Sequence, residues 1–332
     1  MALRKFIFVL PLSFLVLTFS CKNDKILKQN PTGNAGEILV VMNDSIKSSL
    51  AGLFIKDIVQ QPMLGLPQEE PLFKMFTAPH REFDGNLMTF RNIITIDIDN
   101  KSQDDSLEFY KNVWAKDQVV AKITAKSKES LLDLLRYNEI KLVGFFLRAE
   151  RNRNIDYFKA YPNAELIDLL KKQWGIYMTI PNTFKKNKGG ENFTWLSEEG
   201  PVLSLGLIIY SFDYVGEGTF SKEYLLNKRD SVLQKNLPGP SQGSYMTTEH
   251  QYPVIYKKFT LDNNDVVELR GLWKVQNDVM GGPFISHVHY NKEKNKVIVT
   301  EGYVYSPEKP NKRNLMWKQE AILYTYKTLE KN

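Results

Sequence analysis

The segment VIYKKFTLDNNDVVELRGLWKVQNDVMGGPFISHVHYNKEKNKVIVTEGYVY, residues 254–305, determines the architecture of the second half of this 332-residue chain. Its apolar and β-branched runs predict strands at Val254–Leu261, Val266–Val275, Pro283–Tyr290 and Val297–Tyr305. The connections DNND, QNDVMGG and NKEKNK are rich in turn-forming residues and short enough to join neighbouring antiparallel strands. The segment therefore predicts an antiparallel meander.

Flanking segments extend this meander and cover it with helices. Between residues 176 and 214, IYMTIPNTF, NFTWLS and LSLGLIIYSFDY favour further strands, and Ser221 precedes a helix that runs to Asn236. Leu315 to Leu329 is an amphipathic helix that we expect to cover the sheet. Strands followed by a covering helix indicate an α+β fold and not a doubly wound α/β fold.

The chain before this part has its own order of elements. It predicts a strand at EILVVM (37–42), a helix over 45–60, strands at 73–77 and 91–98, a short helix and a strand within 104–125, and helical segments from Lys128 onward. We therefore expect two α+β parts, an N-terminal domain over residues 37–162 and a C-terminal domain with an antiparallel sheet over 163–332.

The first residues, MALRKFIFVLPLSFLVLTFSC, resemble a bacterial lipoprotein signal. Arg4 and Lys5 precede an apolar run of signal-peptide length, and Ser20 stands directly before Cys21, the single cysteine of the chain. The resemblance implies a signal peptide at 1–20 and lipidation of Cys21, followed by a flexible polar tether over 21–36. An ordinary signal peptide with an incidental cysteine and an uncleaved N-terminal anchor are the alternatives.

Composition excludes some classes of function. The chain has 44 Lys and Arg against 38 Asp and Glu, a formal net charge of +6, and no basic stripe interleaved with aromatic residues. Nucleic acid is therefore not an expected partner. The sequence lacks a nucleophile elbow, an HExxH string and a phosphate-binding loop, so we expect neither a cofactor nor an assigned catalytic residue.

Two loops have the composition of a contact surface. LPGPSQGSYM (237–246) and VMGGPF (279–284) combine glycine and proline with large apolar side chains. The candidate binding residues are Tyr245, Met246, Trp273, Met280, Gly281, Gly282 and Phe284. Tight turns in a β-rich domain are the alternative interpretation.

Two further groups could have chemical roles. His287 and His289 alternate on one predicted strand face and could ligate a metal with His250 or Glu249, although two histidines on a solvent-facing sheet are more often simply polar. The basic group Arg148, Arg151 and Arg153 is predicted to lie on a solvated helix face. Asp97 and Asp99 share a strand face and could be metal ligands or paired carboxylates, but an exposed strand edge that runs into a turn is the favoured interpretation.

Several strings carry a resemblance to a known family. GEILVV (36–41), RNIITIDI (91–98), LPGPSQGSYM (237–246) and RGLWKVQNDVMGGPF (270–284), together with the Cys21 leader, are similar to uncharacterised envelope lipoproteins of Bacteroidota, a domain of unknown function. The resemblance spans the mature chain and implies a lipoprotein of the Gram-negative envelope. Its motifs have no assigned chemistry, so no catalytic residue is carried over.

The sequence thus favours a non-enzymatic, lipid-anchored envelope protein, a binding or assembly module at the outer membrane that faces the periplasm or the cell surface. Its expected partners are the membrane, through the lipid, and an envelope protein or glycan. The alternatives are an envelope hydrolase that uses His287, His289 and nearby carboxylates on a glycan or peptide, and a carbohydrate-binding module that uses exposed aromatic rings.

Overall fold

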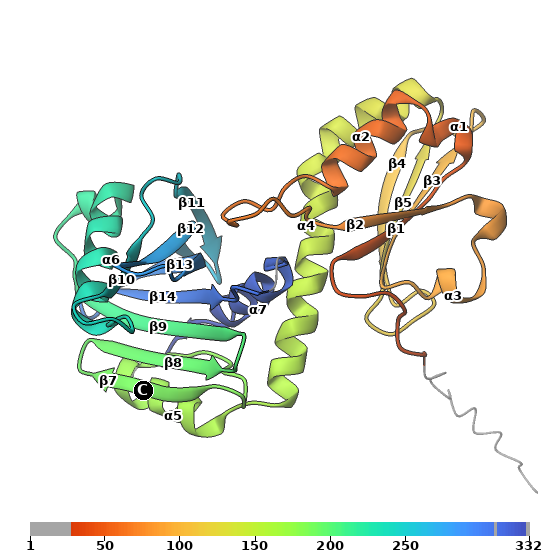
Figure 1. The fold of residues 1–332 in the computed structure, drawn as a ribbon. Coiled ribbons are helices and arrows are strands. Elements are labelled where there is room, and N and C mark those ends of the chain that lie inside the picture. The colour runs from red at the N-terminus through yellow and green to blue at the C-terminus, as the bar shows by residue number, and fades with distance from the viewer. Residues whose placement is uncertain (1–27, 309–310, 330–332) are drawn as a thin grey trace, which may run out of the picture.

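A computed structural model describes residues 28–308 and 311–329 of the chain. It contains two large sheets with one long helix, α4, running between them (Figure 1). The sequence prediction of an α+β fold with an antiparallel sheet covered by helices is confirmed. No helix in the described part of the chain is long and apolar enough to span a membrane.

The first sheet is mostly parallel. Its strands lie in the order β2 (Lys74–Ala78), β1 (Glu37–Val41), β3 (Asn92–Ile98), β5 (Val119–Ala125) and β4 (Ser106–Lys111), and only β4 is antiparallel to its neighbour. The short helix predicted within 104–125 is wrong, because this segment forms β4 and β5. Leu107 and Phe109, two positions apart, both pack against the core, as strand alternation requires.

The helices of this part are α1 (Asp44–Lys47), α2 (Leu50–Val59), η1 (His80–Glu82), α3 (Gly85–Met88) and α4 (Lys128–Ala160). The helix expected over 45–60 is interrupted before Leu50, where Ser49 caps α2 by accepting a hydrogen bond from Gly52 N. The predicted helical segments after Lys128 form one continuous helix of 33 residues. It begins with a capping box in which Ser127 and Ser130 each bond the other's backbone N–H.

The second sheet contains the predicted meander. Strands β11 (Ile255–Leu261), β12 (Asn264–Gln276), β13 (Gly281–Asn291) and β14 (Lys296–Tyr305) pair antiparallel in sequence order. From β14 the sheet continues through β9 (Ser204–Asp213), β8 (Phe193–Glu199) and β7 (Lys185–Gly190). Strand β10 (Tyr245–Thr248) pairs with the same edge of β12 as β11 does, farther along that strand. Strands β7 and β10 are missing from the sequence prediction.

Helices cover both faces of the second sheet. One face carries α6 (Lys222–Asn236), which Ser221 caps, and the other carries α5 (Ala164–Trp174) and α7 (Arg313–Leu323). The helix predicted over 315–329 ends at Leu323, and the residues after it include the short strand β15 (Lys327–Thr328), which pairs with β6 (Ile176–Tyr177).

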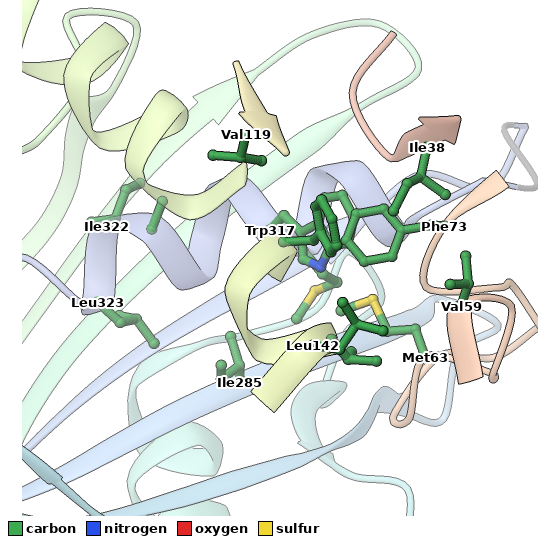
Figure 2. Close-up of a cluster of buried hydrophobic side chains, with 14 of the residues drawn as sticks. Ile38, Val59, Met63, Phe73, Val119, Leu142, Ile285, Trp317, Ile322 and Leu323 are labelled. Atoms are coloured by element: carbon green, nitrogen blue, oxygen red, sulfur yellow. The ribbon is translucent and has the colours of Figure 1, made fainter. Parts of the chain in front are cut away.

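The two sheets share one apolar core. Figure 2 shows Ile38 and Phe73 of the first part beside Leu142 of α4 and Trp317 of α7, with Ile285 of β13 close by. The rings of Phe73 and Trp317 lie 5.5 Å apart. Helix α4 packs against β3 and β5 of the first sheet, α7 packs against β9, β13 and β14 of the second, and the two helices pack on each other. This contact fixes one sheet relative to the other.

The predicted signal peptide and Cys21 lie outside the described residues. Of the predicted tether, residues 28–36 are described, and they are bonded to the first part of the chain. Thr32 N donates to Thr89 O and Arg91 N donates to Thr32 O, each at 2.9 Å, and Lys116 N donates to Gln29 O at 2.9 Å. This part of the predicted tether is therefore held on the folded domain.

Candidate binding groove between the two sheets

A groove of about 530 Å³ lies where the first part of the chain meets the edge of the second sheet. Its walls come from the loop at residues 61–72, from α4, from β11 and β12, and from α7. The lining residues of the groove therefore come from both parts of the chain and lie far apart in sequence.

The loop at residues 61–72 reaches from the first domain to the second sheet (Figure 1). Pro62 and Pro71 form an isolated antiparallel bridge, and Met63 N donates to Glu70 O at 2.8 Å, so the loop is closed at its base. At its tip Gly65 has a φ of +82° and lies so close to β12 that an added Cβ would be 3.2 Å from Arg270 Cβ. Glycine supplies both the positive φ and the close approach.

The floor of the groove is a network of ion pairs. Arg270 donates to Glu268 Oε1 at 2.6 Å and to Glu320 Oε2 at 2.7 Å, and Arg151 pairs with the other oxygen of Glu320 at 3.2 Å. The guanidinium of Arg151 also lies 3.6 Å from the centre of the Tyr324 ring, a cation–π geometry. Each of these four charges has an opposite partner within the network.

The network shifts the acid–base properties of its members. Burial disfavours the Glu268 carboxylate, but Arg270 and a hydrogen bond from His287 outweigh it and hold the pKa of Glu268 well below its usual range. Burial and the charge of Glu320 raise the pKa of Tyr324 to about 12. The Glu268 carboxylate thus stays ionised and paired, and it is not placed to act as a general acid near neutral pH.

The rim of the groove is apolar and open to solvent. Ile140 on α4 is 90% exposed and Leu64 on the loop is 62% exposed. Across from them, Ile255 and Phe259 on β11 are half-buried. An apolar rim over a floor whose charges are already paired suits binding through side-chain contact better than it suits a reaction.

The predicted histidine site does not form. His287 and His289 are buried under α7, not on a solvent face, because the second sheet is covered on both sides. His287 Nε2 lies 3.2 Å from Glu268, His289 stacks on Tyr326, and His250 pairs with Asp230 of α6 at 2.7 Å. Within residues 28–308 and 311–329, no three or more His, Cys, Asp or Glu side chains gather to hold a metal.

The predicted contact loops also differ from expectation. Trp273 and Phe284 are 2% and 0% exposed and lie in the core under α6, so neither ring can meet a partner. Met246 is buried, whereas Tyr245 and Met280 are half-buried. Gly281 and Gly282 belong to β13, and a Cβ on Gly282 would fall 2.0 Å from the carbonyl oxygen of Val304. These two glycines thus serve close strand packing and do not form a tight turn.

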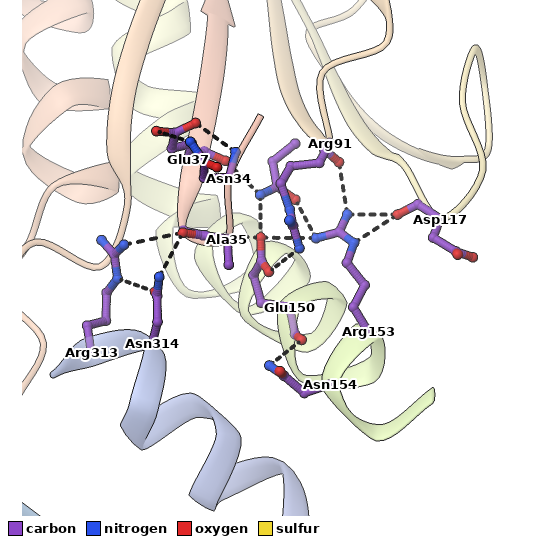
Figure 3. Close-up of polar contacts among 12 residues, drawn as sticks. Asn34, Ala35, Glu37, Arg91, Asp117, Glu150, Arg153, Asn154, Arg313 and Asn314 are labelled. Carbon is purple, nitrogen blue, oxygen red and sulfur yellow. Dashed lines mark hydrogen bonds and ion pairs between the residues drawn. The ribbon is translucent and has the colours of Figure 1, made fainter. Parts of the chain in front are cut away.

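Figure 3 shows the ion-pair network around Glu150 of α4, which includes Arg153 of the basic group. Glu150, 1% exposed, pairs with Arg91 at 2.7 Å and with Arg153 at 3.1 Å. Arg153 also donates to the backbone oxygens of Arg91 and Asp117, and burial lowers its pKa to about 10. The predicted solvated face is thus wrong for Arg151 and Arg153, which face neighbouring elements, and correct for the exposed Arg148.

The acidic pair on β3 has a local role. Asp97 lies 3.2 Å from His80 Nε2, and Asp99 Oδ1 accepts a hydrogen bond from Lys101 N in the following turn. Although β3 is an inner strand of its sheet, both residues stand at its carboxyl end, which explains their exposure.

Comparison with known families assigns no chemistry to these features. Residues 163–325 match the family model of a domain of unknown function, DUF4837, and residues 31–159 match that of a second domain of unknown function, DUF8532. Each part of the chain thus matches a domain family whose description assigns no function. No curated protein matches the chain.

Solved structures give only a distant similarity. The Saccharomyces cerevisiae Ran-binding protein Mog1p is 8% identical with a TM-score of 0.33, and the match covers 47% of this chain and 91% of that protein. A mutant of Mog1 is also 8% identical, with a TM-score of 0.29 and coverage of 47% and 92%. Similarity at this level carries no argument about function.

Proposed function

We propose that the protein is a non-catalytic, lipid-anchored binding or assembly module of the bacterial cell envelope, and that the groove between the two sheets is its contact surface. The observation that carries the proposal is the groove itself: exposed apolar side chains surround a floor whose Arg and Glu side chains already neutralise one another. Such a site can bury apolar surface of a partner without breaking the ion pairs of its floor.

The leader and Cys21 support the anchored placement. An apolar run followed by a small residue and the single cysteine is the pattern of a lipid-modified N-terminus. Mass spectrometry of the mature protein should find a diacylated Cys21 at the N-terminus, and Cys21→Ser should lose membrane attachment. An unmodified thiol, or a chain that keeps its leader, would contradict this part of the proposal.

Site-specific photocrosslinking in intact envelopes tests the contact surface. A photoreactive residue at Ile140, on the rim of the groove, should give adducts with a partner. The same residue at Val279, which is fully exposed in the loop before β13, is the matched control and should give none. Adducts at Val279 with none at Ile140 would show that the contact surface lies elsewhere.

The hydrolase and carbohydrate-binding alternatives have less support. A hydrolase that uses His287 and His289 would need its substrate to reach side chains that are at most 5% exposed. A flat row of exposed rings on a sheet face would favour glycan binding, but helices cover both faces of the second sheet.

A further inference from the structure

Strand β11 forms an open edge of the second sheet. In the described part of the chain it pairs only with β12, to which it is joined by a two-residue turn at Asp262 and Asn263, both with positive φ. In such a hairpin the backbones of Leu261 and Asn264, the residues beside the turn, donate a hydrogen bond to each other. Every second residue of β11 before Leu261 is bonded in the same way to its partner on β12. The backbone N–H and C=O groups of the alternate residues therefore point away from β12.

Those outward residues are Tyr256, Lys258 and Thr260. Their backbone groups make no hydrogen bond with any other segment of residues 28–308 and 311–329. Lys258 and Thr260 are exposed, so the edge is accessible. A strand edge of this kind is a template for one more strand.

The other residues of β11, whose backbone groups are bonded to β12, place their side chains in the lining of the groove. Ile255, Lys257 and Phe259 share one face of β11, and Ile140 and Val143 of α4 belong to the opposite wall. A strand edge beside a helix wall is one of the recurring geometries for binding an extended peptide. The backbone edge supplies hydrogen bonds, and the groove accepts every second side chain.

The charges on β11 indicate which kind of segment can pair with this strand. Lys257 and Lys258 are both exposed on the edge strand, whereas the acidic side chains of the floor, Glu268 and Glu320, are already paired with arginines. Pairing with the same strand of a second copy would set lysines against lysines, which is unfavourable. The edge therefore favours an acidic segment of a different protein.

We propose that an extended acidic segment of a partner protein adds to β11 as a further antiparallel strand and inserts alternate apolar side chains between β11 and α4. This rests on the function proposed above and specifies its mode of recognition. Carboxylates of the segment lie opposite Lys257 and Lys258, and its apolar side chains lie opposite Ile255 and Phe259.

The test uses a labelled hexapeptide, acetyl-Thr-Val-Glu-Glu-Thr-Ile-amide, whose antiparallel register places Glu against each lysine and apolar residues against the groove. Its affinity for the full-length chain is measured by fluorescence anisotropy, with a peptide carrying Lys-Lys in place of Glu-Glu for comparison. We expect the acidic peptide to bind about tenfold more tightly, the effect of one good charged contact. Equal binding of the two peptides would overturn the proposal.

Variants separate strand addition from general charge attraction. Lys257→Glu/Lys258→Glu should reverse the preference between the two peptides, whereas Lys185→Glu/Lys186→Glu, an equal charge change on the other edge strand β7, should not. Bound peptide should also slow amide hydrogen exchange at Lys258 and Thr260. Unchanged exchange, or reversal by the β7 variant as well, would exclude strand addition.

Repeating the Ile140 photocrosslink in the Lys257→Glu/Lys258→Glu chain distinguishes this proposal from the broader one. Loss of an adduct that the unchanged chain forms supports strand addition. An adduct that persists overturns strand addition but leaves the groove as the contact surface. Failure of the unchanged chain to form any adduct removes the proposed function, and this inference with it.

Discussion

Arg229 and Glu301 carry opposite charges where no solvent reaches, since both side chains are 0% exposed. Arg229 donates to the two carboxylate oxygens of Glu301 at 2.8 and 2.7 Å and to Thr248, while Ser286 donates to Glu301 at 2.6 Å. The guanidinium also lies 3.8 Å from the centre of the Phe284 ring. The charges are thus tolerated because hydrogen bonds satisfy them on several sides.

Arg229→Met should destabilise the fold by about 3–5 kcal/mol, because it leaves the Glu301 charge buried without its partner. The double variant Arg229→Met/Glu301→Leu should recover most of this loss, since neither charge then remains. Urea unfolding of the three proteins measures the effect. Arg136→Met, which removes a pair with Asp133 on an exposed face of α4, is the control and should cost less than about 1 kcal/mol.

His289 should make stability depend on pH. Burial, together with neighbouring His287, holds the pKa of His289 well below its ordinary value, so the folded chain keeps it neutral while the unfolded chain binds a proton below about pH 6.5. The free energy of unfolding should therefore fall as pH decreases from 6.5 to 5, by up to about 1.4 kcal/mol per pH unit from this residue.

His289→Phe should reduce that slope. The ring stacks on Tyr326 with centroids 3.6 Å apart, and its Nε2 has no hydrogen-bond partner in the described structure, so phenylalanine can take its place. Urea titrations at several pH values provide the comparison. A slope equal to that of the unchanged chain would show that His289 does not titrate as described.

At the scale of elements, Glu320 on α7 connects three parts of the fold. It accepts hydrogen bonds from Arg151 of α4 and from Arg270 of β12, so one carboxylate joins the long helix, the last helix and the second sheet. The groove floor depends on this side chain, because its removal leaves Arg151 without a carboxylate partner and Arg270 with Glu268 alone.

Glu320→Ala should cost about 1–3 kcal/mol of unfolding free energy, the penalty for leaving buried charged groups without a partner. Lys318→Ala, an exposed position on the same helix, is the matched control. Equal stability of the two variants would show that the network does not support α7.

Local sequence patterns predicted the elements whose side chains alternate strongly or whose caps are clear. Strands β12 to β14 and the cap Ser221 are of this kind. Strand β7, KKNKGG, has no apolar alternation and is held by pairing with β8, a tertiary effect that no local pattern records.

The site was harder to predict than the fold. Alternation correctly placed His287 and His289 on one face, but a single sequence does not show whether that face meets solvent or a helix. The same limit led to Trp273 and Phe284 being interpreted as surface groups. The groove joins Leu64, Ile140, Phe259 and Glu320, and nothing local to any of these positions indicates that they meet.

At the scale of the whole molecule, the shared core holds the two sheets in a fixed position relative to each other. The N-terminus of α7 is tied to the first domain: Glu70 accepts hydrogen bonds from the backbone N–H groups of Lys312 and Arg313, and Arg313 donates to Pro71 O. Trp317, one turn later, packs on Phe73. Loss of either sheet would therefore expose apolar surface of the other.

We expect the two sheets to unfold together. Native-state hydrogen exchange should give the most protected amides of β3 and β14 the same free energy of opening. Trp317→Ala should lower both values by about 3–5 kcal/mol, because it empties the contact between the sheets. A lower opening energy for β3 alone would show that the first domain unfolds independently.

The position of α7 in the chain also affects how the protein matures. The ribosome makes Phe73 long before it makes Trp317, so the strands of the first domain are synthesised while one wall of their core is still missing. Until α7 arrives, the apolar side of α4 must stay uncovered or be shielded by a chaperone. The core of the first domain is thus completed only after α7 has been synthesised.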